Sequence, residues 1–155
     1  MTIELAKLKA LTIRQPWADL ILRGLKTIEI REWQVKHRGP FLIHVSRTID
    51  WKTVQLLCYE GVEELPRGMI VGYAQIEDVV LLNHDRRLAH LKDHWVVHPL
   101  PEFSCAAVLS NMKPFSKPIR CSGRPFFFSP PPNILRTCGR RLEELGFDVQ
   151  ENSIT

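Results

Sequence analysis

The eight residues from 24 to 31, Gly-Leu-Lys-Thr-Ile-Glu-Ile-Arg, constrain this chain more than any other stretch. Side chains of a β-strand point alternately to its two sides. In a strand here, Ile28 and Ile30 share one side, which suits a core. Lys26 precedes them, and the other side collects groups that a dry core does not hold: Thr27, Glu29, Arg31 and Trp33. The pattern predicts a rigid strand with one apolar and one polar side.

Two interpretations of the polar side are open on spacing alone. Antiparallel sheets often leave one face in water, where Lys, Glu and Arg are solvated and their pairs contribute little to stability. Alternatively, an amine, a carboxylate, a guanidinium and an indole gathered on one rigid element form a binding site. The flanking sequence favours the second interpretation.

The strand and its flanks resemble one known family. Gly24, Lys26, Glu29 and Arg31 match the pattern G-x-K-x-x-E-x-R. This pattern is the signature of the ASCH (activating-signal-cointegrator homology) domains, a branch of the PUA-like β-barrels. Residues 11–18 resemble the family's opening L-x-x-x-Q-P-W-A, and residues 38–46 resemble R-G-P-x-x-I-H-A-S with Val45 in place of alanine. A later element, Pro118-Ile119 followed by Gly123, also resembles the family. The resemblance is sharpest over residues 11–46.

The resemblance implies a single ASCH, PUA-like domain over residues 1–155. Its fold class is α+β, a small mixed or antiparallel β-barrel of five to six strands flanked by helices. The residue patterns predict strands at 8–13, 41–46, 69–82, 104–115 and 126–128, with a break at 111–113. They predict helices that begin at 15–17, at 50 with Asp50 as N-cap, and at 133 with Asn133 as N-cap and an end near Leu145. We expect residues 150–155 to form a flexible tail.

Composition narrows the class of protein and partner. The hydrophobic fraction of 45% is typical of a globular chain, and no apolar run reaches membrane-spanning length. The four cysteines form no C-x-x-C pair and the N-terminus has no apolar signal core. We therefore expect reduced thiols in the cytoplasm, or in the nucleus. A net charge of +4 and a pI near 9.0 are compatible with a polyanionic partner without establishing one.

Histidines are concentrated between positions 84 and 98. Among them, His90, His94 and His98 have the i, i+4 spacing of metal ligands on a helix. No cysteine or carboxylate pattern accompanies them, and Pro99 ends any helix there. We therefore expect no metal and no cofactor, and interpret the segment as a rim over the cleft that Trp95 anchors.

The predicted site combines the polar side of the 24–31 strand with neighbouring segments. His44 and Ser46 lie opposite the apolar side of their own strand, so we expect them to join Glu29 and Arg31. Lysine and arginine bind phosphate, tryptophan stacks a base, and a carboxylate accepts from a base amino group. The full predicted ligand-binding set is Gln15, Trp17, Lys26, Thr27, Glu29, Arg31, Trp33, Arg38, His44 and Ser46. With the resemblance, it implies binding of RNA, another single-stranded nucleic acid or a nucleotide-like small molecule.

Two other functions remain open. Some members of the superfamily resemble hydrolases of RNA or of acetylated cytidine. A metal-independent hydrolase here would use Lys26, Glu29 and His44 as catalytic groups. The catalytic threonine of the acetylcytidine amidohydrolases falls at Glu29, so the chain departs from that subgroup at a decisive position. The third function is a protein-interaction module of a transcriptional coregulator, with an exposed apolar patch at residues 95–97.

Overall fold

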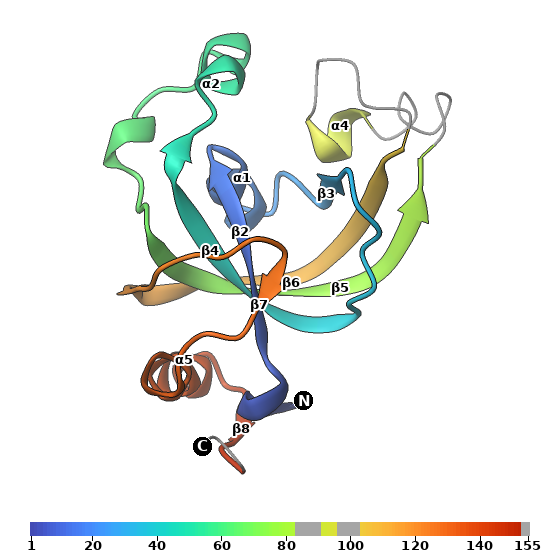
Figure 1. The fold of residues 1–155 in the computed structure, drawn as a ribbon. Helices are drawn as coiled ribbons and strands as arrows, with labels where there is room; N and C mark the ends of the chain where they lie inside the picture. The colour runs from blue at the N-terminus through green and yellow to red at the C-terminus, as the bar shows by residue number, and fades with distance from the viewer. Residues whose placement is uncertain (83–90, 96–102, 153–155) are drawn as a thin grey trace.

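One strongly curved sheet of six strands organises the molecule (Figure 1). The computed structural model describes residues 1–82, 91–95 and 103–152. In spatial order, the strands are β3 (Ile28–Arg31), β6 (Cys105–Arg120), β5 (Met69–Leu81), β4 (Gly39–Ile49), β2 (Lys9–Gln15) and β7 (Phe127–Phe128). The β2–β4 pair is parallel and the other pairs are antiparallel, so the sheet is mixed.

Shorter elements complete the chain. The helices are α1 (Trp17–Leu22), α2 (Trp51–Leu57), α4 (Leu91–His94) and α5 (Pro132–Glu144), with single 3-10 turns at η1 (Leu5–Lys7) and η2 (Val62–Glu64). A second, two-stranded sheet pairs β1 (Thr2–Glu4) with β8 (Asp148–Gln150) in parallel. No helix among the described residues has the length and apolar character needed to cross a membrane.

The six strands and flanking helices confirm the predicted α+β class, but the sheet is not closed into a barrel. Its edge strands, β3 and β7, are four and two residues long and pair only with β6 and β2. No pairing between β3 and β7 joins the two edges among the described residues. The curvature arises where β5 crosses β6, since the pairing register shifts three times there. A Cβ at Gly72 would lie 2.5 Å from the Lys113 carbonyl oxygen, so glycine permits this close strand approach.

Both faces of the sheet are covered. On the concave face, α1 packs against an upper core that includes Phe41, Ile43 and Val45 of β4, as their alternation predicts. On the other face, α5 packs against a lower core that includes Leu42. The even-numbered residues of β4 therefore face a second apolar layer.

Local signals place most element ends within a few residues. Asp50 caps α2 as predicted, its Oδ1 accepting from the Thr53 amide at 3.1 Å. The break predicted at 111–113 is a local distortion and not an end of the strand: Asn111 takes a left-handed φ of 50° and the pairing with β5 shifts register there, but β6 continues to Arg120. The last helix starts with Pro132 at its first position and has no side-chain cap at Asn133. Gln150, expected in a tail, pairs with β1.

Candidate nucleic-acid interface

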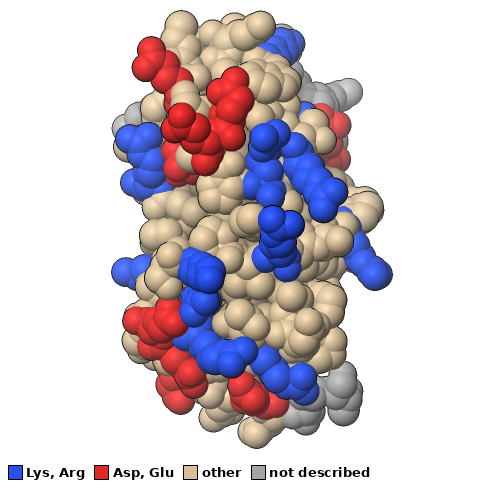
Figure 2. Space-filling view, turned by 90° about the vertical axis from the view of Figure 1, so that its left-hand side faces the viewer, with Lys and Arg blue, Asp and Glu red and all other residues tan. Residues whose placement is uncertain are grey.

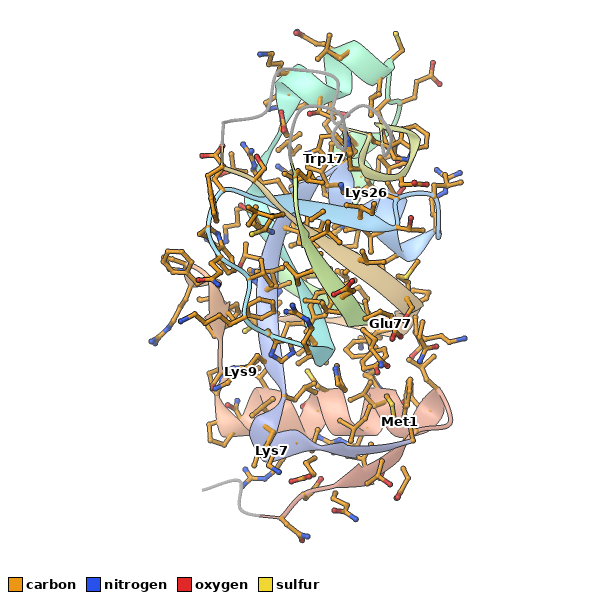
Figure 3. The ribbon with its side chains drawn as sticks, turned by 90° about the vertical axis from the view of Figure 1, so that its right-hand side faces the viewer. Met1, Lys7, Lys9, Trp17, Lys26 and Glu77 are labelled. Carbon is orange, nitrogen blue, oxygen red and sulfur yellow. The ribbon has the colours of Figure 1, made fainter. Side chains whose placement is uncertain are left out.

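Lys26 lies just before β3 and is buried, with 1% of its surface exposed. Its Nζ donates hydrogen bonds to the carbonyl oxygens of Ile28 at 2.5 Å and His94 at 2.7 Å. The same atom lies 3.9 Å from Glu29 Oε2 and 4.9 Å from the centroid of the Trp17 ring. Figure 3 shows Lys26 and Trp17 together at the end of the molecule opposite α5.

Glu29 links Lys26 to Arg31. Its Oε1 is 3.7 Å from Arg31 Nη2, and its Oε2 is buried without a hydrogen-bond partner in the described part of the chain. Burial lowers the pKa of the Lys26 amine to about 8; Glu29 opposes this shift and Arg31 adds to it. On the other side of β3, Ile28 packs in a small apolar cluster. The polar side of this strand is therefore a buried charge cluster and not a solvated face.

Arg31 reaches from this cluster to β2, where Nη2 donates to the Thr12 carbonyl oxygen at 2.9 Å. Thr12 Oγ1 lies 3.0 Å from His44 Nδ1, and His44 Nε2 lies 2.7 Å from the Cys121 carbonyl oxygen. Because a carbonyl only accepts, His44 carries a proton on Nε2, and Nδ1 pairs with the Thr12 hydroxyl, which also lies 3.4 Å from the Arg124 carbonyl oxygen. Burial lowers the pKa of His44 against the raising effect of the bond to Cys121. The imidazole is therefore neutral at neutral pH and holds the backbone at Cys121.

The structure separates the predicted catalytic groups. His44 shares its strand face with Leu42 of the lower core, whereas Lys26 contacts Trp17 of the upper core. Three adjoining hollows are formed by described residues on one face of the molecule, and Lys26 and Glu29 line none of them. The expected shared hollow is therefore found in part: one of the three hollows is lined by Arg31, His44 and Ser46, whereas Lys26 and Glu29 are buried outside these three.

Gln15 and Trp17 make internal contacts. Gln15 Nε2 donates to the Pro66 carbonyl oxygen at 3.2 Å, and its Oε1 accepts from the Asp19 amide at 3.0 Å. Trp17 is buried and its Nε1 donates to Asp50 Oδ2 at 3.2 Å. These bonds fix the junction between β2 and α1.

The other predicted site residues lie apart from one another. The Thr27 amide donates to the Asp93 carbonyl oxygen at 3.1 Å. Trp33 is half-buried against the upper core. Arg38 is exposed and donates to the carbonyl oxygens of Val35 and His37. Ser46 Oγ accepts from the Thr48 amide at 3.1 Å, and Ser46 lines a hollow together with Arg31 and His44.

That hollow, of about 510 Å³, joins two others of about 670 and 700 Å³. All three share Cys121 and Ser122, and together we call them the arginine groove. Five arginines line it and no Asp or Glu does: Arg31, Arg47, Arg67, Arg120 and Arg124. The last four are exposed, and within the described ranges none forms an ion pair with a carboxylate. Figure 2 shows Lys and Arg side chains gathered along the middle of this face.

Backbone contacts hold the groove together. The Cys121 amide donates to the Gly68 carbonyl oxygen at 3.2 Å, and the Gly68 amide donates to the Val45 carbonyl oxygen at 2.8 Å. A Cβ at Gly123 would lie 2.6 Å from His44 Cε1. The loop after β6 is thus seated tightly on the sheet, and it keeps its guanidinium groups at the surface.

Sequence reasoning missed four of these arginines, because they come from the ends of two strands, β4 and β6, and from two loops with no shared motif. Only Arg31 belonged to the predicted site. One signal did point to the region: Gly123, matched in the late family element, lies in the groove. Pairing of Met69 with Arg120 brings the loop before β5 beside the end of β6.

The histidine segment lies largely outside the described residues, as do His84, His90, His98 and the predicted patch at 96–97. His94 is buried, and its carbonyl oxygen accepts from Lys26. Trp95 Nε1 donates to the Leu25 carbonyl oxygen at 3.0 Å, which fixes this segment to the turn before β3. Among described residues, no group of three His, Cys, Asp or Glu side chains is placed to hold a metal ion, and the four cysteines are free thiols.

A short segment of the chain is similar in sequence to known proteins. A 33-residue segment, 21% of the chain, is 48% identical to Activating signal cointegrator 1 of Homo sapiens, and the same holds for that of Mus musculus. The match spans 6% of the length of these relatives.

Solved structures match over more of the chain. The crystal structure of ASCH from Zymomonas mobilis superposes with a TM-score of 0.62 at 15% identity, over 93% of this chain and 99% of that one. A structure of a tyrosine-to-phenylalanine variant of that protein superposes with a TM-score of 0.55 at 17% identity, over 74% of this chain and 76% of that one. The model of the ASCH domain matches residues 11–119. This chain belongs to the ASCH domain family.

Proposed function

We propose that the arginine groove binds the phosphate backbone of RNA. The observation that carries this proposal is the lining of the groove, in which five arginines occur without a carboxylate. Exposed guanidinium groups without acidic partners are available to an external anion, and their planar fork matches the oxygens of a phosphate. The net charge of +4 acts in the same direction over a longer range.

The groove has the form that a polymer requires. Its three hollows adjoin through Cys121 and Ser122 and carry arginines along their whole course. A single phosphate would need only one of these sites, whereas a chain of nucleotides presents phosphates at regular intervals. We therefore favour RNA over a free nucleotide.

Salt dependence of affinity tests the proposal. If Arg47, Arg67, Arg120 and Arg124 each contact one phosphate, the logarithm of the association constant falls with the logarithm of salt with a slope of roughly −3. Affinity then drops about 50-fold between 50 and 200 mM salt. We would measure it by fluorescence anisotropy with a labelled 12-nucleotide RNA.

Two arginine variants locate the contacts. Replacing Arg120 and Arg124 together by glutamine should weaken binding and reduce the slope by about 1.4, since each lost phosphate contact removes about 0.7. Arg140→Gln is the matched control, because Arg140 is exposed on α5 and lines no part of the groove. Binding that does not depend on salt, or equal loss in both proteins, would contradict the proposal.

Hydrolysis of RNA or of a modified nucleoside is the second candidate, and Lys26 favours it. A buried amine with its pKa lowered to about 8, beside a carboxylate oxygen without a hydrogen-bond partner, is typical of reactive sites. Acetate release from N4-acetylcytidine by the wild type, abolished in Lys26→Met, would support this activity. A folded wild type that releases no acetate and leaves labelled RNA uncut would contradict it.

A further inference from the structure

Phe126 is an exposed aromatic residue within the arginine groove. It has 59% of its surface exposed and lines the hollow that Arg31 and Arg124 also line. Its φ of 59° lies in the left-handed region, which is unfavourable for a bulky residue. The fold thus holds a large apolar ring in water, at a backbone conformation that costs free energy, among guanidinium groups.

The ring is supported from behind. Trp33 contacts Phe126 edge-on, with ring centroids 5.0 Å apart and an interplanar angle of 80°. Trp33 also contacts Phe127 at 6.0 Å, and both pack against the upper core. Phe126 is therefore the outermost ring of an anchored aromatic cluster, which distinguishes it from a scattered surface side chain. Trp33, predicted to stack a base, instead lies behind the ring that is exposed.

We infer that Phe126 stacks an unpaired base, and that the groove therefore prefers single-stranded RNA to duplex RNA. This inference rests on the proposed RNA binding. An aromatic ring beside phosphate-binding arginines accepts the flat face of a nucleobase whose phosphates the arginines hold. In a duplex that face is covered by the neighbouring base pairs, so only the phosphate contacts remain available.

Leucine at position 126 separates stacking from other effects. Phe126→Leu keeps an apolar side chain at the same left-handed backbone position but removes the planar ring. We expect its affinity for a mixed A/U 12-nucleotide single strand to fall about 5- to 100-fold. The salt slope should stay unchanged, because the arginines are intact, and affinity for the corresponding duplex should change less than twofold. Phe126→Trp should bind the single strand about as tightly as the wild type does, because it keeps a planar ring at this position.

Phe103→Leu is the matched control, since Phe103 is 43% exposed but precedes the opposite end of β6. Thermal unfolding followed by circular dichroism would verify that all variants are folded. If Phe126→Leu binds the single strand as tightly as the wild type does, the inference is overturned, while the proposed RNA binding stands. If the wild type binds neither the single strand nor the duplex, the proposed function itself is refuted.

Discussion

Replacing Lys26 by methionine should remove a contribution to stability that grows in the wild type between pH 8 and 10.5. The pKa of this buried amine is lowered from 10.5 to about 8 in the folded chain. In this interval the unfolded state binds more protons than the folded state, so the free energy of unfolding increases with pH. The slope approaches 1.4 kcal/mol per pH unit and the full rise is roughly 3 kcal/mol.

The measurement compares urea unfolding curves of the two proteins from pH 7 to 10.5. Burial raises the pKa of Tyr73 and of Cys138 to about 12, so both groups lower stability at alkaline pH. They do so equally in both proteins, and the difference between wild type and Lys26→Met isolates the amine. Lys52→Met, at an exposed position of α2, is the control and should follow the wild type. Parallel curves for wild type and Lys26→Met would refute the buried, charged state assigned to Lys26.

Three further predictions concern positions around the groove and α2. Gly123→Ala should lower the free energy of unfolding by about 1–3 kcal/mol, because the new Cβ would clash with the His44 ring. Urea unfolding measures this change. An unchanged midpoint would contradict the tight packing of the loop on the sheet. Nitrogen NMR of His44 should show the neutral tautomer with the proton on Nε2 and a pKa below 6.5, whereas a proton on Nδ1 would contradict the bond to Cys121. Although burial raises the pKa of Asp50, its hydrogen bonds lower it further, so its stabilisation should disappear as pH falls through the folded pKa. Asp50→Asn should retain the cap on Thr53 but lose this acid dependence, and identical acid profiles would argue against it.

The sequence predicted β4 well, because its apolar and polar residues alternate and a strand with this period buries one side. Phe41, Ile43 and Val45 lie in the upper core as expected. The same alternation led us to expect Glu29 and His44 on an open polar side. It does not reveal that a second layer covers that side. Glu29 is buried beside Lys26, and His44 lies beneath the loop after β6.

The arginine groove could not be predicted from local pattern. Its arginines stand at positions 31, 47, 67, 120 and 124, and only the pairing of β5 with β6 and the seating of one loop bring them together. Spacing in sequence carries no information on such long-range convergence. Phe126 was predicted as part of the strand at 126–128, whereas its left-handed φ of 59° places it before β7 and in solvent.

Backbone amide NMR during an RNA titration tests the central claim most directly, because it locates the ligand without any substitution. With a 12-nucleotide single-stranded RNA, the account predicts that the largest shifts fall at Arg47, Gly68, residues 120–124 and Phe126. Amides near Lys26 and on the outer side of α5 should move little. Shifts concentrated around Lys26 and Trp17, with the 120–126 loop unchanged, would contradict the assignment of the arginine groove as the RNA-binding surface.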